Sequence, residues 1–287
     1  MNQNALSLEF GCSTEWNIEN SDAIASFVRP ATTLQLDIVL PKGLAAPIDF
    51  PSLDQMVLPG DSLVLAVEST VPCCEEIAAL TAQWFVEQGS QIEHIAVVIA
   101  DGDAAVQEKV QLAITNLLGK SIPVEVHDPD DSDRLAYLGA NFDAEPIYIN
   151  RTVFDADVVV PIQRARADGS LDDFGSFSMF PLLSDRQTIG HFYRLGSLCK
   201  SNGRKKLRAW AEEAAACTGF MTTIQVVPAG GDSVAAIAVG TSRSADQLGR
   251  QVMNELWGNQ AKVTEAELVL ALLVGGANQN WRGIARA

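Results

Sequence analysis

The strongest constraint on the fold is an alternation of short, β-branched apolar runs with longer segments of helical period. Residues 63–67 are expected to form a buried strand, 74–87 a helix that stops before Gly89, and 94–100 the next strand. A second helix over 104–118 ends at Gly119, and residues 124–126 begin a third strand. This βαβαβ order predicts an α/β protein, with a Rossmann-like, mostly parallel sheet and helices on both faces.

The middle of the chain contains two short extended pieces and a long segment without period. Residues 135–139 and 146–149 flank a turn and predict a hairpin added to the sheet, and residues 157–162 form another buried strand. Residues 163–178 are rich in Asp, Gly and Ser and show neither helical nor strand period. We expect a long functional or mobile loop there, and the site within it.

The last hundred residues predict a second α/β region. The pattern becomes helical from Asp185, with an Ala-rich stretch at 207–218, followed by strands at 222–227 and 234–239. A helix at 244–257, a strand at 268–274 and a glycine turn follow. We therefore divide the chain into an N-terminal domain, 1–185, and a second region, 186–287, which stops inside what looks like a new helix and is expected to be incomplete.

Composition excludes several classes of partner. No apolar run approaches the ~20 residues needed to cross a bilayer, and the N-terminus lacks a secretory signal, so we expect a cytoplasmic protein without membrane contact. A net charge of −16 repels a phosphate backbone, which argues against nucleic acid as a partner. The basic cluster 204–208 suits the solvated end of a helix. The five cysteines show no CxxC spacing and are expected to be reduced, and a homo-oligomer is compatible with all of this.

Several motifs resemble the nickel-dependent lactate racemase family, and in particular its N-terminal domain. They are LPGD at 58–61, LAYLG at 135–139, PIYINR at 146–151, DADVVV at 155–160, FP at 180–181, QTI at 187–189 and the glycine pair at 275–276. The resemblance spans nearly the whole chain, although family members continue past the position that matches Ala287.

The resemblance implies a two-domain protein whose cleft holds a nickel pincer nucleotide attached to a lysine. In that family the cofactor accepts and returns a hydride and interconverts 2-hydroxy acids. Such chemistry needs a general base on each face of the substrate carbon, a cation for the substrate carboxylate and a metal ligand.

The positions that match the catalytic residues of the family mostly hold other side chains. In the motif after the first strand, Glu68 replaces the second acid, Thr70 is retained, and Val71 replaces the substrate-binding arginine. After the second strand, Ala104 stands where the family has a catalytic histidine. The cofactor lysine corresponds to Phe177, which cannot form the covalent link.

The remaining functional positions are also altered. No histidine lies between His127 and His191, so the second catalytic imidazole is missing. The nickel-ligand position falls on Tyr193, which leaves His191, two residues away, as the candidate metal ligand. In the last helix, Gly283 and Arg286 match a glutamine and a lysine that contact substrate, so only the positive charge is retained.

Polar residues at the ends of the predicted strands are the alternative source of chemistry. Glu68, Asp101, Asp103 and His127 are candidate catalytic residues, because parallel sheets bind ligands at the carboxyl ends of their strands, and carboxylates there can hold Mg²⁺ or Ca²⁺. Equally, Asp101 and Asp103 suit loop or N-cap positions before helix 104–118, and His127 suits a structural role.

Basic and thiol groups near the same edge have two interpretations as well. Arg164 and Arg166, with Thr70 and Arg286, are candidates for binding an anionic substrate, or else the arginines form local salt bridges. The adjacent pair at 73–74 lies at a predicted helix N-terminus, where a thiolate is stabilised, or is simply buried.

Our leading hypothesis is a lactate racemase-like protein of the 2-hydroxy acid racemase/epimerase superfamily that lacks nickel pincer catalysis. If active, it would be an isomerase of 2-hydroxy acids, and no cofactor is assigned to it. One alternative is a non-catalytic binding or regulatory module that uses the interdomain cleft for a small anion. Another is a metal-assisted enzyme that uses the strand-end carboxylates.

Overall fold

A computed structural model describes residues 34–257, apart from residues 142, 199–200 and 230–231, together with the backbone of two strands near the N-terminus. Those strands, β1 (Ala5–Phe10) and β2 (Thr14–Glu19), pair antiparallel with each other. The strand expected at 268–274, the glycine turn after it, Gly283 and Arg286 lie outside the described residues.

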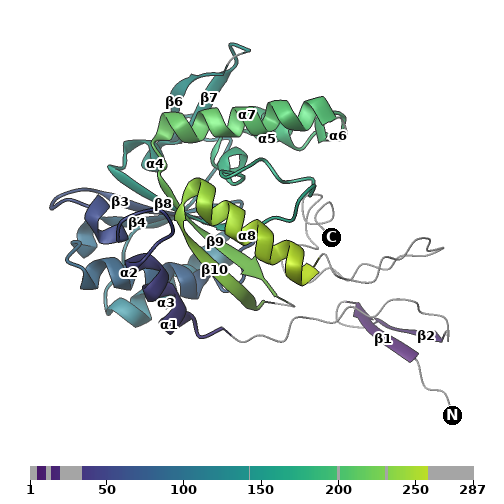
Figure 1. The fold of residues 1–287 in the computed structure, drawn as a ribbon, viewed down its shortest axis with the longest axis horizontal. Helices are drawn as coiled ribbons and strands as arrows, with labels where there is room; N and C mark the ends of the chain where they lie inside the picture. The colour runs from purple at the N-terminus through teal and green to yellow at the C-terminus, as the bar shows by residue number, and fades with distance from the viewer. Residues whose placement is uncertain are drawn as a thin grey trace.

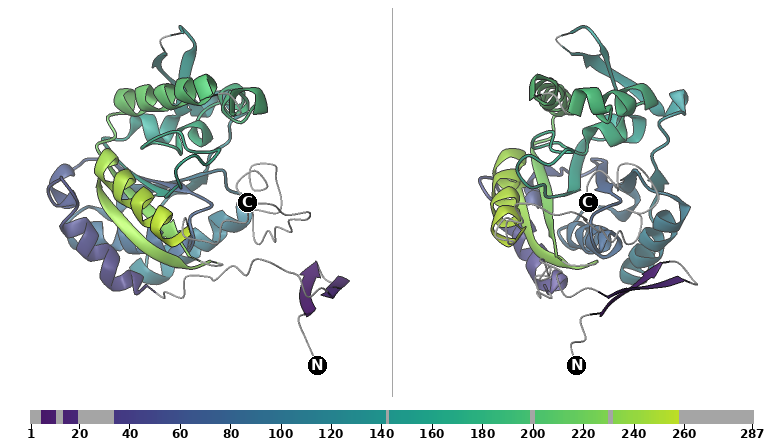
Figure 2. Two further views of the ribbon diagram at one scale, coloured as in Figure 1. Left: turned by 45° about the vertical axis from the view of Figure 1, so that its right-hand side comes forward. Right: turned by 90° about the vertical axis from the view of Figure 1, so that its right-hand side faces the viewer.

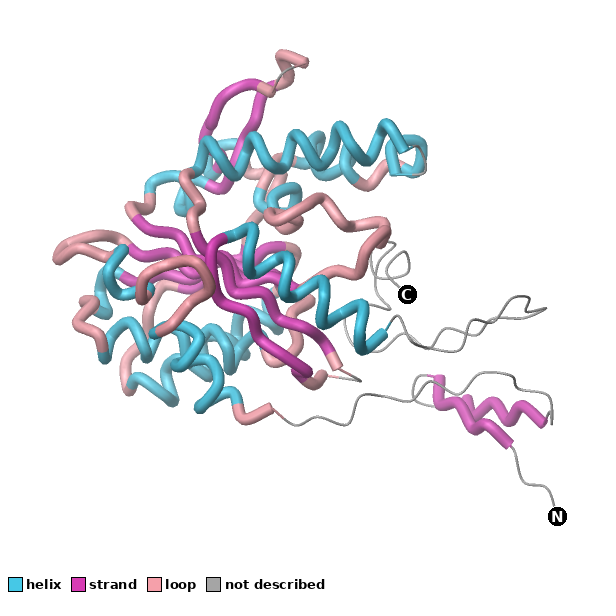
Figure 3. The backbone as a smooth tube through the Cα atoms, in the orientation of Figure 1, coloured by secondary structure: helices cyan, strands magenta, loops and turns pink. Residues whose placement is uncertain are grey.

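A six-stranded sheet forms the centre of the molecule (Figures 1 and 3). Its order is β10-β9-β8-β3-β4-β5, with every neighbouring pair parallel except the antiparallel β10–β9 pair. The strands are β3 (Leu63–Glu68), β4 (Ile95–Ala100), β5 (Val124–Val126), β8 (Val158–Arg164), β9 (Thr222–Pro228) and β10 (Val234–Thr241).

Helices cover both faces of this sheet, as the two turned views in Figure 2 show. The helices α1 (Leu36–Ala45), α2 (Cys74–Glu87) and α3 (Ala104–Leu118) enclose the larger apolar core against one face. On the other face a second core lies under α5 (Arg186–Phe192), α6 (Leu195–Leu198), α7 (Ser201–Thr218) and the 3-10 turn η4 (Phe180–Leu183). The helix α8 (Ser242–Trp257) packs on β9 and β10.

The central strands are apolar along their whole length because both of their faces are covered. All six residues of β3 are buried, and alternate side chains enter opposite cores: Leu65 faces the first core, and Ala66 faces the second. This is why the sequence shows continuous apolar runs at these strands rather than an alternation of apolar and polar residues. The predicted α/β fold with a mostly parallel sheet is confirmed.

The ends of α3 illustrate how local sequence sets the boundaries of an element. Asp103 adopts an extended backbone, and its carboxylate accepts a hydrogen bond from the Val106 amide at 3.0 Å, which makes it the N-cap. Gly119 ends the helix with a left-handed φ of 69°, a conformation that glycine adopts without steric cost. The helix expected at 104–118 therefore has the predicted bounds.

The hairpin of β6 (Leu135–Ala140) and β7 (Pro146–Asn150) was expected to join the main sheet, and this is wrong. It forms a separate two-stranded sheet. The physical reason is that its apolar face is used elsewhere: Ile147 and Ile149 are fully buried in the second core, which lies above the sheet. Figure 1 shows the hairpin beside α7, away from the six strands.

The proposed boundary at 185/186 falls between β8 and β9, which are neighbouring strands of one sheet. Residues Ile162, Gln163 and Arg164 of β8 pair in parallel with 224–226 of β9. The described strands of the second region thus extend the sheet of the first. Among the helices of the described residues, none is long and apolar enough to cross a membrane.

Candidate functional site

The carboxyl ends of β3 and β8 bring together four of the residues that the sequence singled out. Glu68, the last residue of β3, has no exposed surface, and both its carboxylate oxygens contact Arg166 Nη2, at 3.0 and 3.1 Å. The Thr70 hydroxyl donates to the same carboxylate at 2.7 Å, and the Arg164 amide donates at 3.1 Å. Because β3 and β8 are adjacent and parallel, residues 96 and 98 positions away in sequence reach Glu68.

A second carboxylate, that of Asp172, closes this cluster from the loop that follows β8. Its Oδ2 atom lies 3.0 Å from Arg164 Nη2 and 3.3 Å from Arg166 Nε. The side chains of Glu68, Arg166 and Asp172 are at most 5 % exposed, and that of Arg164 is 20 % exposed. Two carboxylates and two guanidinium groups therefore form a largely buried ion-pair network in which the two positive and two negative formal charges are equal in number.

Sequence reasoning missed Asp172 altogether. It lies in the segment without period, where no pattern distinguishes a buried aspartate from the exposed Asp168. The available signal was that Asp172 lies eight residues after Arg164 and six residues after Arg166. This spacing does not predict a contact unless the loop is known to fold back on β8.

The other strand-end carboxylates have local roles in the structure. Asp103 is exposed and caps α3, the alternative considered for it from the sequence. Asp101 follows β4 with a left-handed φ of 57°, and its backbone carbonyl accepts a hydrogen bond from the Ser69 hydroxyl. Within the described residues there is no group of three or more His, Cys, Asp or Glu side chains that could hold a metal ion.

His127 follows β5 and is buried, with 6 % of its surface exposed. Its Nε2 atom lies 2.8 Å from the Ser184 carbonyl, so this nitrogen carries the proton and donates. The Asn150 amide group then donates to Nδ1, at 3.3 Å. Burial lowers the pKa of His127 below its ordinary value, which favours the neutral ring. This geometry ties β5, the hairpin and η4 together.

Phe177, at the position that resembles the cofactor lysine, lies inside the second core. It is 2 % exposed, and its ring centroid is 4.6 Å from that of Phe220 and 6.2 Å from that of Phe180. An apolar, closed aromatic environment supplies neither an amine for a covalent link nor room for a nucleotide. The residues at this position do not fit a lysine-linked nickel pincer nucleotide.

The candidate metal ligand His191 lies on α5 and is partly exposed. Its ring packs edge-on against Trp210 of α7, with centroids 5.3 Å apart. Tyr193, at the matched nickel-ligand position, packs against Phe174 with centroids 5.8 Å apart. Both side chains thus contribute aromatic packing between the loop, α5 and α7.

The thiols at the start of α2 are not activated. Cys73 is partly buried and Cys74 is buried. Desolvation by burial is the largest cause that raises their pKa values, to about 11 and about 12, and nearby carboxylates add to it. These values disfavour a nucleophilic thiolate at neutral pH.

Residues 165–179, which we call the strap, have neither helix nor strand but are extensively buried. Gln163, a residue that sequence reasoning did not select, fixes one end: its amide group donates to the Ser176 carbonyl at 2.7 Å and accepts from the Met179 amide at 3.2 Å. Phe174 and Phe177 anchor the strap in the second core. The loop expected here is therefore a packed segment.

Comparison with known proteins gives a family match and a similar structure. Residues 14–198 match the family model described as lactate racemase N-terminal domain. The apoprotein of lactate racemase from Thermoanaerobacterium thermosaccharolyticum is similar in structure, with a TM-score of 0.67 and 15 % sequence identity, over 88 % of this chain and 62 % of that one. The chain thus spans less than two thirds of the length of that protein. No curated protein matches the sequence.

Proposed function

The chain belongs to the family defined by the lactate racemase N-terminal domain, and we propose that it is a member that does not catalyse racemisation with a nickel pincer nucleotide. The observation that carries this proposal is the burial of Phe177. The position that resembles the cofactor lysine is an aromatic side chain with 2 % exposure, packed on Phe220. An exposed polar residue at this position would leave room for a cofactor, whereas a phenylalanine packed in a closed core leaves none.

The Glu68 network supports the same proposal. In the family that this sequence resembles, the motif after the first strand contains an arginine that binds the substrate carboxylate. In this chain the matching residue is the buried Val71. The carboxylate of Glu68 is already bound by Arg166 and Thr70. A base for proton transfer must be able to reach the substrate, and Glu68 has no exposed surface.

The test is a racemisation assay of the purified protein supplied with nickel pincer nucleotide. We expect no conversion of D- or L-lactate above the rate without protein, and no mass increase of the intact chain from a covalent cofactor. The lactate racemase from Thermoanaerobacterium thermosaccharolyticum, loaded in the same way, is the positive control. Clear turnover, or a covalent adduct on this chain, would refute the proposal.

A second candidate function is the binding of a small anion, and the positions of Arg164 and Arg166 favour it. Both lie where β8 ends, at the edge where parallel sheets bind ligands. Titration calorimetry with lactate, against lactamide as the uncharged analogue, tests this function. Binding of lactamide with equal affinity would contradict recognition of a carboxylate.

A metal-assisted enzyme built on the strand-end carboxylates has less support. Glu68 is paired with Arg166, and Asp103 is used as a helix cap. Metal analysis of the protein purified without added metal is the direct test of that alternative.

A further inference from the structure

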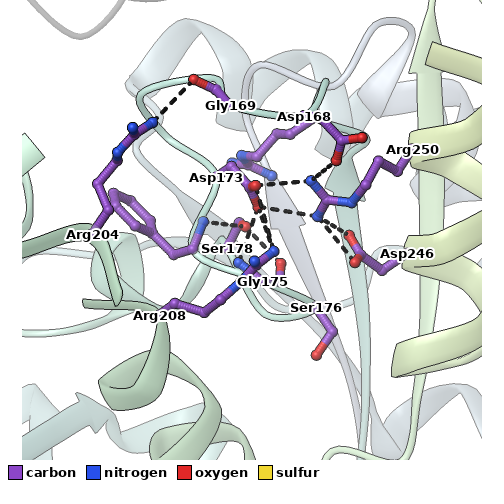
Figure 4. Close-up of polar contacts among 12 residues, drawn as sticks. Asp168, Gly169, Asp173, Gly175, Ser176, Ser178, Arg204, Arg208, Asp246 and Arg250 are labelled. Carbon is purple, nitrogen blue, oxygen red and sulfur yellow. Dashed lines mark hydrogen bonds and ion pairs between the residues drawn. The ribbon is translucent and has the colours of Figure 1, made fainter. Parts of the chain in front are cut away.

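The strap carries a run of carboxylates that are bound by arginines, and Figure 4 shows those of Asp168 and Asp173 with Arg208 of α7 and Arg250 of α8. Between Arg166 and the buried Phe174, its polar contacts with the rest of the protein are made largely by Asp168, Asp172 and Asp173. Asp172 faces inward, to Arg164 and Arg166 at the end of β8. The other two face outward, toward α7 and α8.

Asp173 is the centre of the outer contacts. Arg250 of α8 binds it through two hydrogen bonds, with Nη1 2.8 Å from Oδ2 and Nη2 3.0 Å from Oδ1. Arg208 of α7 approaches Oδ1 at 3.2 Å. Arg250 also contacts Asp168 and Asp246, each at 3.1 Å. We call Asp173, Arg208 and Arg250 the latch, because these side chains join the strap to both helices.

Access to solvent varies within both sets of contacts, and Arg164 of the inner network is 20 % exposed. The side chains of Glu68, Arg166 and Asp172 are at most 5 % exposed. In the latch, Arg250 is 14 % exposed and Arg208 is 44 % exposed, and an open hollow of about 450 Å³ borders Arg250, Asp168 and Asn254. The latch borders this hollow and joins the strap to α7 and α8, so its loss would weaken the attachment of the strap to both helices, whereas Asp172, 5 % exposed, becomes accessible when the strap moves.

Opening would change the charge of the inner network. With Asp172 in place, two carboxylates balance two guanidinium groups. If residues 167–173 move outward while Phe174 stays in the core, Arg164 and Arg166 keep their contacts with Glu68 but lose the carboxylate of Asp172, so the cluster loses one negative charge. Two guanidinium groups at the carboxyl end of a parallel strand are suited to a carboxylate of a small molecule, which would take the place of Asp172.

We propose that the strap is a latched cover on an anion site, in which Asp172 occupies the place of a small carboxylate ligand and the Asp173–Arg250 pair controls its release. The proposal rests on the anion-binding function put forward above and adds its regulation. No bond is made or broken in the exchange, because one carboxylate replaces another on the same two arginines.

The first test measures opening by limited proteolysis. Chymotrypsin cleaves after large apolar residues, and the bond after Leu171 lies inside the segment that moves and is protected while the strap is closed. Cleavage under these conditions reports the population of the open form. We expect Arg250→Gln to raise the rate of cleavage after Leu171 on the order of tenfold or more, since it removes charge-assisted hydrogen bonds from the poorly exposed carboxylate of Asp173.

The matched control is Arg204→Gln. Arg204 contacts the same strap, but through the backbone carbonyl of Gly169 at 3.3 Å rather than through a carboxylate. Its substitution should leave the cleavage rate within about twofold of the parent protein. Asp173→Asn removes the same latch from the side of the strap and should act as Arg250→Gln does, while α8 keeps the ion pair between Arg250 and Asp246. Circular dichroism of each variant verifies that the fold is retained.

The second test measures the anion site with sodium lactate as the probe and lactamide as the neutral control. We expect calorimetric affinity for lactate to increase about tenfold in Arg250→Gln and in Asp172→Asn relative to the parent chain, with no binding of lactamide. Asp172→Asn removes the internal competitor without touching the latch.

The outcomes separate the two parts of the proposal. Equal cleavage rates in Arg250→Gln and Arg204→Gln overturn the latch. Faster cleavage without lactate binding in either open variant overturns the anion site, and with it the second candidate function, but leaves the latch in place. Equal lactate binding by the parent chain and the variants supports an anion site and overturns its control by the strap.

Discussion

Replacement of Glu68 by glutamine tests whether the charge network at the end of β3 and β8 is a unit. The carboxylate has no exposed surface and accepts hydrogen bonds from Thr70, the Arg164 amide and Arg166. Glutamine has nearly the same size but no charge, so Arg166, 3 % exposed, would lose its ion pair with Glu68 and keep its contact with Asp172.

The expected loss in the free energy of unfolding follows from the burial of the ion pair between Glu68 and Arg166. Removal of one member of a buried ion pair costs about 3–5 kcal/mol, because the remaining charge is left uncompensated in a poorly polarisable environment. Glutamine keeps one acceptor oxygen, which places Glu68→Gln near the lower limit, at about 3 kcal/mol. For a domain of this size, such a loss lowers the melting temperature by about 6–12 °C.

The assay is urea unfolding monitored by tryptophan fluorescence, carried out as a double-mutant cycle with Arg166→Met. If the two side chains form one unit, the double variant should be more stable than the sum of the single effects predicts, by at least ~1 kcal/mol. Glu93→Gln, which disrupts an exposed ion pair with Lys120, is the control and should change stability little. A loss below about 1 kcal/mol in Glu68→Gln, or additive effects in the cycle, would refute the reasoning.

Three further predictions concern other parts of the molecule. Phe177→Ala should lower the free energy of unfolding by about 3–5 kcal/mol, since it opens a cavity in the second core; Phe154→Ala, at a side chain 45 % exposed, should cost far less, and equal losses by urea titration would contradict the burial of Phe177. Because burial lowers the pKa of His127 in the folded state, the unfolded chain binds a proton more readily. The contribution of His127 to stability is therefore complete above about pH 6.5 and is lost as the pH falls below that value toward the folded-state pKa. Between pH 7.5 and 5.5, the free energy of unfolding should decline less in His127→Gln than in the parent chain; equal declines would exclude this role. Finally, Cys73 and Cys74, with pKa values raised to about 11 and about 12, should react with iodoacetamide at pH 8 much more slowly than the exposed Cys217. Mass spectrometry of the alkylated peptides checks this order, and labelling of Cys73 or Cys74 before Cys217 would contradict it.

The sequence was most informative where structure depends on near neighbours. The helices 74–87 and 104–118 have the predicted bounds, because apolar period, the Asp103 cap and Gly119 act within a few residues of one another. The buried strands were recognised for a similar reason, since a strand covered on both faces is apolar at every position. The hairpin was located correctly, but its partner was not, because the sheet that a strand joins depends on which core its apolar face enters.

For the candidate site, the sequence located the polar residues but not their partners. Glu68, Arg164 and Arg166 were chosen because they lie at the ends of predicted strands, and Thr70 because it is retained in the motif that resembles the family. Parallel pairing of β3 with β8 does bring them together. Whether they bind an external ligand or one another depends on Asp172 and on the path of the strap. The same holds for Phe177. A phenylalanine side chain cannot form a covalent link to a cofactor, which the sequence already indicates, whereas its packing on Phe220 is seen only in the structure.

The sequence by itself thus determined the α/β fold and the edge of the sheet that carries the polar residues, and it predicts Phe177 at the position that resembles the cofactor lysine. Only the tertiary structure decided that these polar residues form a largely buried ion-pair network, closed by a strap that Arg250 holds in place. The physical reason is the distance along the chain over which each kind of interaction acts. Caps and periodicity act over one or two turns of chain, whereas the contact of Glu68 with Arg166 joins residues 98 positions apart and exists only once the sheet has formed.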